Sequence, residues 1–524
     1  MLAAAFASWI EHLPERAFDE PFLNLLRAQG FYDIHFTHGA YEFGKDFIAK
    51  RNEPLPTQYG FQAKSGDIAG GAWDAILAQL LELSAGTPTH PSYAPELPRK
   101  SVLVVTGRLI GKAVVGPSQF KDMLHQLGRG EFEVWDIDVL KELVEGSSRF
   151  PVVPVAALLP SLGLLESSIP NERDLEHCLA ALVPAPGASI EQFRRAFVDN
   201  WLVVSRLLDK GYTFLSLFAA LNGVRVGAAR AHTHRGEGQE LLAHALDSYV
   251  VLGHNNLEPL LATPRDQDAW IEWVGGASGI VNYPIACTRV LEFLGLAALH
   301  RDHQGRVDEA RELAELAAVI VESQPGAAHP ISDRSASVYP AVLAALVRFG
   351  HQSVASRLLR STTKWVCDRY EASNFGLAST YSTPEEEVRT LLAAPFEFAE
   401  LSERRDSLLF VALADASYTL VPDDFADILN EFLAVRIIPT GLHAEDSAAA
   451  YLVGGGATRG LVNIRYPDTV TTAPLAHHAM QPGPRTLELA CGPVGPLAIS
   501  CIVRDRLFTD VLERCRKTTR TIQN

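Results

Sequence analysis

The pattern of secondary structure changes near Gly146, and this change constrains the fold more than any other feature of the sequence. Up to residue 145, short apolar strands are interspersed with helical segments. A Pro-rich connection then leads into a long succession of helical segments with few strand signals. The chain has 524 residues, too many for one compact core. We therefore expect an α/β domain, followed by a mostly α-helical, repeat-like domain.

The expected boundaries follow from the same pattern. They are an α/β domain at 1–148, a Pro-rich linker at 149–170, a helical repeat-like domain at 171–461, and a cap of mixed structure at 462–524. Within the first domain, apolar spacing predicts helices at Phe18–Gln29, Trp73–Ser84, Gln119–Leu127 and Val139–Val144. The predicted strands are Tyr32–Thr37, Asp46–Lys50, Gln58–Lys64, Ser101–Thr106 and Phe132–Ile137.

Two helical segments of the second part repeat at an offset of 45 residues. Gly305 is followed five residues later by Ala310, and Gly350 is followed five residues later by Ala355. An apolar helix precedes and follows each glycine, as in stacked helix pairs that bury their apolar faces against neighbours. The layout resembles a tetratricopeptide array, although its helices are longer. An irregular all-α domain is the alternative.

Charge and composition exclude several classes of protein. The net charge is −16, and residues 1–150 hold 14 Lys+Arg against 19 Asp+Glu, a net of −5, so no basic nucleic-acid-binding surface is evident. Met1–Ile10 is apolar but lacks a basic start, and it predicts an amphipathic helix rather than a signal peptide. No segment predicts a membrane span. We expect a cytoplasmic protein with no membrane contact and with free, buried cysteines.

Three polar residues of the first domain could hold a divalent cation beside a phosphodiester. Gln62 and Lys64 are two positions apart in an expected strand, so they point to the same face, with Phe61 and Ala63 toward the core. If the Asp46 strand pairs with this strand, all three side chains meet. Oxygen ligands for Mg²⁺ and a nearby cation are what phosphodiester hydrolysis requires. A solvated hairpin with ordinary polar residues is the alternative.

An ordered series of segments around these residues resembles one nuclease family. The series is FDEPFLNLLRAQGF (Phe18–Phe31), GKDFIAKR (Gly44–Arg51), YGFQAKSG (Tyr59–Gly66), VLVVTG (Val102–Gly107) and VWDIDVL (Val134–Leu140). Residues 18 to about 145 resemble the PD-(D/E)xK superfamily, specifically its Mrr-type restriction endonucleases. The resemblance implies a restriction-endonuclease-like mixed sheet flanked by helices, covering about a quarter of the chain.

The resemblance also implies a catalytic set. Asp46 and Gln62 would bind Mg²⁺, with Mn²⁺ as a substitute, and Lys64 would act on water and phosphate. Most of the superfamily has a carboxylate where this chain has Gln62, so a second carboxylate is expected from the first helix. Asp19 and Glu20 are the candidates. Spacing from Gly30 favours Asp19 and reach favours Glu20 as the metal ligand, while an ordinary helix N-terminal charge is the alternative for either.

The implied function is Mg²⁺-dependent cleavage of DNA, with RNA as an alternative substrate. Mrr-like nucleases fused to helical modules are typical of bacterial anti-phage defence, and the helical region would sense a signal or assemble a homo-oligomer or protein complex. Because the nuclease domain is acidic, we expect weak intrinsic DNA affinity that assembly or a partner must supplement. The rival is a non-catalytic nucleic-acid-binding or helical-repeat scaffold.

Four other features carry weaker signals. Histidines 232 and 234, and the adjacent His477 and His478, lack partners at metal-site spacing and are expected to be surface imidazoles. The glycines 454–456 have no lysine at phosphate-loop spacing. Tyr41 and Phe43 are expected to pack in the core, with base stacking as the alternative. The basic end, with Arg514, Arg516, Lys517 and Arg520, is expected to be a solvated helix end, with phosphate contact as the alternative.

Overall fold

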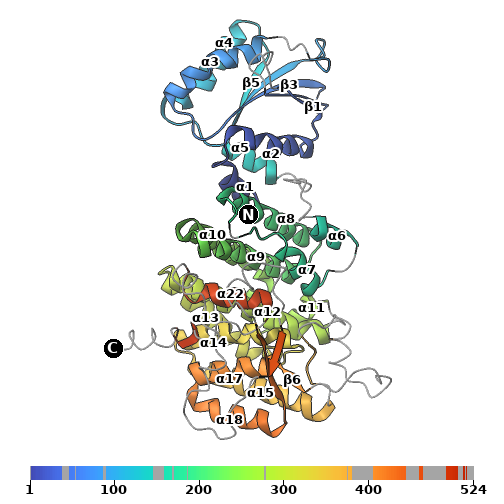
Figure 1. Cartoon of the computed structure of the whole chain (residues 1–524), viewed down its shortest axis with the longest axis vertical. Helices are drawn as coiled ribbons and strands as arrows, with labels where there is room; N and C mark the ends of the chain where they lie inside the picture. The colour runs from blue at the N-terminus through green and yellow to red at the C-terminus, as the bar shows by residue number, and fades with distance from the viewer. Residues whose placement is uncertain are drawn as a thin grey trace. The chain divides into compact units, whose positions relative to one another are not determined.

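The chain folds into two compact units. The first comprises residues 1–156 and 194–202, and the second comprises residues 157–193 and 203–524. The computed structural model describes residues 2–37, 46–52, 55–86, 90–145, 159–167, 170–185, 187–275, 279–373, 376–379, 387, 405–443, 460–463, 491–504, 511–513 and 515. In Figure 1 the sheet and the helices around it are blue to cyan, and the helices of the second unit run from green to red.

A five-stranded mixed sheet forms the centre of the first unit. Its strands lie in chain order and are β1 (Tyr32–Phe36), β2 (Phe47–Arg51), β3 (Thr57–Lys64), β4 (Arg99–Val105) and β5 (Glu131–Trp135). β1–β2 and β2–β3 are antiparallel, whereas β3–β4 and β4–β5 are parallel. Parallel neighbours require crossover connections, and helices α3 (Gly70–Ala85) and α4 (Gly116–Gln126) supply them.

Helices cover both faces of this sheet. On one face, Trp73 and Leu80 of α3 and Phe120 of α4 pack with Leu103 and Phe132 in one buried cluster. On the other face lies α2 (Glu15–Ala28), which is preceded by α1 (Leu2–Ile10). The Phe22 ring of α2 lies 5.3 Å from the rings of both Phe47 and Phe61 and 6.4 Å from that of Trp135. The α5 helix (Ile137–Glu145) completes the unit.

The mixed α/β first unit and the helical region after it confirm the coarse fold class expected from the sequence. All five expected strands of the first unit are present, with ends shifted by one or two residues. Helix α2 begins at Glu15, three residues before the expected start at Phe18, directly after Pro14, whose backbone is extended. The short helix η1 (Gly111–Val114) was not expected.

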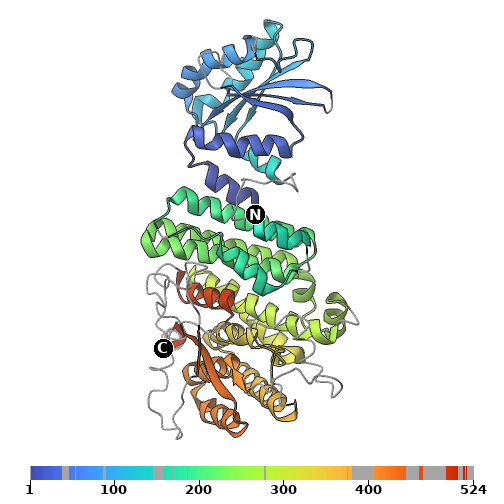
Figure 2. The ribbon, with the colours of Figure 1, turned by 45° about the vertical axis from the view of Figure 1, so that its right-hand side comes forward.

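The second unit is built mainly from helices. They are α6 (Leu159–Ser167), α7 (Glu172–Ala180), α8 (Ile190–Asp209, partly in the first unit), α9 (Thr213–Thr233), α10 (Arg235–Ala262), α11 (Gln267–Trp273), α12 (Gly279–His303), α13 (Val307–Ser323), α14 (Val338–Arg348), α15 (Gln352–Ser373), α17 (Leu408–Leu420), α18 (Pro422–Ala434) and α22 (Val494–Val503). Short connections join several of them into antiparallel pairs, such as α9 with α10 and α12 with α13 (Figure 2).

The two glycines of the expected repeat both lie in short turns between paired helices. Gly305 (φ +76°) connects α12 to α13, and Gly350 (φ +88°) connects α14 to α15. These left-handed conformations favour glycine because it has no Cβ. Ala310 and Ala355, five residues on, are fully buried in the second helix of each pair. The sequence offset therefore corresponds to two equivalent helix–turn–helix pairs.

A small sheet was not expected within the helical range. It has three strands, β6 (Asp406–Ser407), β7 (Ile438–His443) and β8 (Gly460–Asn463). β7 is preceded by Arg436, whose left-handed conformation (φ +60°) ends the α18 turn and redirects the chain. β7 contains Pro439 and Gly441, two residue types that are depleted in strands, so the sequence did not indicate a strand here.

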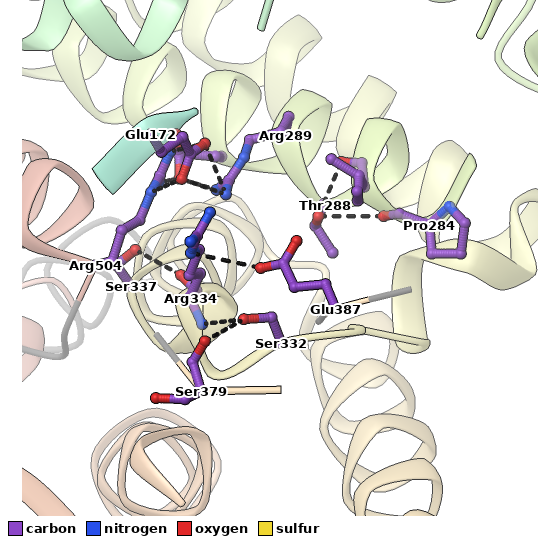
Figure 3. A network of polar contacts seen from close by, with 12 residues as sticks. Glu172, Pro284, Thr288, Arg289, Ser332, Arg334, Ser337, Ser379, Glu387 and Arg504 are labelled. Atoms are coloured by element: carbon purple, nitrogen blue, oxygen red, sulfur yellow. Dashed lines mark hydrogen bonds and ion pairs between the residues drawn. The ribbon is translucent and has the colours of Figure 1, made fainter. Parts of the chain in front are cut away.

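A network of buried charges lies inside the second unit (Figure 3). Its members are Glu172 of α7, Arg289 and Glu292 of α12, Arg334, Glu387, and Arg504 after α22, each less than 10% exposed. Arg504 donates to Glu172 from Nε and from Nη2, at 2.9 Å each. Its Nη1 pairs with Glu292. Arg289 lies 3.0 Å from Glu172, and Arg334 lies 3.4 Å from Glu387. Three arginines thus balance three glutamates.

Burial alone would raise the pKa of Glu172, but the charges of Arg289, Arg504 and Arg334 outweigh it and lower the pKa to about 2. Glu387 is the opposite case, because burial there dominates and raises its pKa despite the nearby Arg334. Glu172, which pairs with both Arg289 and Arg504, is therefore strongly stabilised in its ionised form, whereas Glu387 is not. Removing one partner from such a buried pair is strongly destabilising.

All six cysteines carry reduced thiols, and all but Cys178 are buried, which agrees with the expectation of buried thiols. Among the helices that the structure describes, none combines the length and apolar character needed to cross a membrane.

Candidate active site at the end of strands β2 and β3

Asp46 and Gln62 meet where β2 and β3 pair. Phe47 lies opposite Phe61 in the antiparallel register, so the preceding Asp46 lies opposite Gln62. The Gln62 amide donates to Asp46 Oδ2 at 2.8 Å, and the same oxygen accepts the backbone N–H of Ala63 at 2.7 Å. Both side chains are 5% exposed. The sequence expectation that these two residues converge agrees with this geometry.

Lys64 ends β3 and is held by a carboxylate from α2. Its Nζ donates to Glu15 Oε1 at 3.2 Å, and its side chain is 19% exposed. Lys64 is two residues beyond Gln62, so both leave the strand on the same face, while Phe61 and Ala63 are fully buried on the other. Gln62, which is bonded to Asp46, and Lys64, which is paired with Glu15, therefore lie two residues apart at the end of β3.

Glu15 was missed by the sequence analysis, which considered Asp19 and Glu20 instead. Residues four apart share a helix face, so Asp19 follows Glu15 on the same face of α2. Asp19 is half-buried, whereas Glu20 is exposed. One residue step turns a helix by about 100°, which carries Glu20 away from the face that Phe18 and Phe22 bury against the sheet. The geometry favours Asp19 over Glu20. The four-residue spacing of Glu15 and Asp19 could have indicated, from the sequence alone, that these two carboxylates share one face of the helix.

Two loops beside Lys64 are tied to each other. The Lys64 carbonyl accepts the backbone N–H of Thr106, and the Thr106 hydroxyl accepts the N–H of Gly66 at 2.9 Å. The Asp67 carboxylate accepts the N–H of Arg108 at 2.8 Å. These bonds extend the β3–β4 pairing beyond the strand ends, and they fix the backbone that carries Lys64. A site built on strands and bonded loops is held in one geometry.

The donor set is oxygen-rich and suits a hard divalent cation such as Mg²⁺. Asp46 offers a carboxylate and Gln62 an amide oxygen, while Glu15 of α2 brings a further carboxylate to Lys64 at the end of β3. Within the part of the chain that the structure describes, no three His, Cys, Asp or Glu side chains are already gathered as a metal site. Gln62 in place of a carboxylate is consistent with this finding, because an amide is not counted among such groups. The residues fit an ion that also keeps water ligands.

A second polar cluster lies toward the opposite end of the β1–β2 hairpin. His35 Nε2 lies 2.7 Å from Asp33 Oδ1 and 2.8 Å from the Ser92 hydroxyl. Lys50 also donates to Asp33 at 2.8 Å, and the hydrogen bonds from Lys50 and His35 lower the pKa of Asp33 to about 2. In a catalytic triad the serine and the carboxylate bind different ring nitrogens. Here both lie at Nε2, so this cluster is not arranged for nucleophilic catalysis.

Comparison with known proteins gives no relative from which a function could be carried over. The sequence matches no family profile, and neither a curated protein nor a solved structure matches it.

The other sequence candidates contribute no site. His232 and His234 are exposed at the end of α9, as expected for surface imidazoles. Tyr41, Phe43, His477, His478, the glycines 454–456 and the basic residues 514, 516, 517 and 520 lie outside the described residues.

Proposed function

We propose that the first unit is a Mg²⁺-dependent endonuclease of the restriction-endonuclease type that cleaves DNA. The observation that carries this proposal is the direct contact between Asp46 and Gln62 beside a Lys64 that Glu15 holds. These are the residue types that the resemblance to Mrr-type nucleases implies, gathered at one end of two paired strands. A hairpin with ordinary polar residues would have no reason to bury Asp46 and Gln62 together.

The roles follow from position and chemistry. Asp46 and Gln62 would hold the cation, with Asp19 of α2 as the candidate for a further carboxylate. A bound Mg²⁺ supplies Lewis-acid stabilisation of charge on the phosphate oxygens and lowers the pKa of a water ligand. Lys64 carries a positive charge close to the same position, where it orients water and balances charge on the phosphate. Glu15 positions Lys64 through their ion pair.

The helical unit is proposed to sense a signal or to assemble the nuclease, as in anti-phage defence proteins. The acidic character of residues 1–150, with a net of −5, supports this division of labour. Weak intrinsic affinity for DNA is overcome when several sites act together. The same charge favours one rival, a non-catalytic module whose nuclease-like unit only binds a partner.

The deciding experiment is cleavage of supercoiled plasmid by the full chain, with Mg²⁺, with Mn²⁺ and with a chelator, and with RNA as a parallel substrate. Lys64→Ala should lower the rate by roughly 10²-fold or more, as for loss of a group that stabilises transition-state charge. The matched control is Lys50→Ala, because Lys50 lies on β2 with 18% exposure and pairs with Asp33. Equal cleavage by the two variants, or no metal-dependent cleavage by the wild-type protein, would favour the non-catalytic module.

A further inference from the structure

A groove runs along the surface of the helical unit between α10 and α13. Its volume is about 530 Å³, and Phe293 of α12 lies at its base. Apolar side chains line both walls: Val250, Val251 and Leu261 from α10, and Leu313 and Leu316 from α13. Val251 is 44% exposed, and Leu261, Leu313 and Leu316 are partly exposed. An apolar surface of this kind, left open to water, marks a binding site more often than a single exposed residue does.

The rim of this groove is acidic. Glu258 of α10 and Glu312 of α13 are exposed, and Glu309 lies deeper along the same wall. Arg301, which also lines the groove, donates to Asp247 at 3.0 Å and lies 3.6 Å from Glu309, so its charge is already paired. His254 is the other basic group that lines the groove. The rim therefore presents more negative than positive charge to any occupant.

We propose that this groove binds an amphipathic helix of a protein partner, one with leucine-like side chains on one face and lysine or arginine residues at its flanks. The lining of α10 runs from Val250 to Ala262, a length of about 18 Å at 1.5 Å per residue, which matches roughly three turns of a bound helix. Apolar positions at i, i+3, i+4 and i+7 fill grooves of this type. The acidic rim selects basic flanks and steers their approach.

The same charges argue against two other occupants. A second copy of this chain, docked groove to groove by two-fold symmetry, would place the acidic rims against each other. A nucleic-acid strand would meet carboxylates rather than cations. The site lies entirely within the helical unit, so the inference does not depend on the nuclease activity.

The test measures binding of two fluorescent helical peptides to the full chain by anisotropy. Both peptides carry leucines at i, i+3, i+4 and i+7, and they differ only in flanking lysines or flanking glutamates. The lysine peptide should bind at least about tenfold more tightly, and this preference should weaken as salt is added. Equal binding of both peptides, or no binding of either, would overturn the proposal.

Substitutions in and around the groove test whether the peptides bind there. Val251→Asp should weaken the lysine peptide by about tenfold or more, since it places a charge in the apolar wall. The double variant Glu258→Lys with Glu312→Lys should reverse the peptide preference. Glu240→Lys, an exposed glutamate of α10 that does not line the groove, is the matched control and should change little. If Val251→Asp instead abolishes self-association measured by sedimentation, without affecting the peptide, the occupant is a second copy and the proposal fails.

Discussion

The side-chain nitrogen of Gln62 lies 2.8 Å from a carboxylate oxygen of Asp46, so an amide and an acid share a buried position across two strands. If the unit is the nuclease proposed above, Gln62 takes a place that most of that superfamily gives to a second carboxylate. The amide lets the pair exist without a cation, because one partner donates a hydrogen bond to the other. Two carboxylates at the same distance would repel each other unless a metal lay between them.

Gln62→Glu tests this relationship directly. Without divalent cation at neutral pH, the variant should lose about 1–3 kcal/mol of unfolding free energy, since a buried hydrogen bond becomes a like-charge contact. Mg²⁺ should restore most of that loss, because a ligand that binds only the folded state stabilises it. Thermal unfolding with and without Mg²⁺ measures both effects. Gln62→Leu is the control, which should be destabilised but not rescued by Mg²⁺, and equal rescue of the two variants would contradict the assignment.

The acidic residues of α2 should differ in their contribution to cleavage. Glu15→Gln and Asp19→Asn should each slow plasmid cleavage by about tenfold or more, because they share the face that reaches Lys64. Glu20→Gln should change the rate by less than about twofold, since Glu20 is turned about 100° away. Initial rates over a range of Mg²⁺ concentrations separate weaker metal binding from slower chemistry. A larger effect at Glu20 than at Asp19 would reverse the order that the geometry favours.

Gly116 should be intolerant of substitution for steric reasons. A Cβ at this position would overlap the Trp73 ring, where α4 meets α3, so Gly116→Ala should destabilise the first unit by about 1–3 kcal/mol. At Gly71, on α3, a Cβ would meet nothing within 4 Å. Gly71→Ala should therefore be neutral or stabilise by up to about 1 kcal/mol. Calorimetric unfolding compares the two, and similar melting temperatures would show that Trp73 can move aside.

Acid should unfold the helical unit through Glu172. The folded-state pKa is lowered to about 2, so ionised Glu172 contributes stability that is complete above its ordinary pKa and is lost as pH falls toward 2. Arg504→Met removes the bidentate partner, which should cost about 3–5 kcal/mol and move acid unfolding to higher pH. Circular dichroism during acid titration measures the midpoint. Arg311→Met, which breaks the exposed Arg311–Asp308 pair, should leave that midpoint unchanged.

The sequence predicted those parts of the structure that depend on local pattern. Alternation along β3 placed Gln62 and Lys64 on one face, and the turn between β2 and β3 brought Asp46 opposite Gln62. Glu15 was missed because it precedes the apolar stripe that begins at Phe18, and only the fold shows that the first turn of α2 reaches Lys64. An ion pair between a helix start and a strand end depends on tertiary packing, which periodicity does not report.

The buried charge network could not be predicted from the sequence either, because it also depends on tertiary packing. Its members come from α7, α12, the segment after α13, residue 387 and the residue after α22, and no local motif links them. Arginine and glutamate are almost never fully buried unless they are paired. Nothing in the sequence distinguishes a buried, paired arginine or glutamate from one at the surface. Only their mutual distances distinguish them.

The Glu172–Arg504 pair spans 332 positions, and this separation sets the order in which the protein can be completed during synthesis. The mixed sheet is complete once Trp135 has left the ribosome. Until Arg504 has been synthesised, Glu172 lacks the arginine that donates two hydrogen bonds to it, and Glu292 is paired with Arg289. A nascent chain thus carries a formed sheet ahead of an unfinished helical unit, and a chain truncated before Arg504 would remain in that condition.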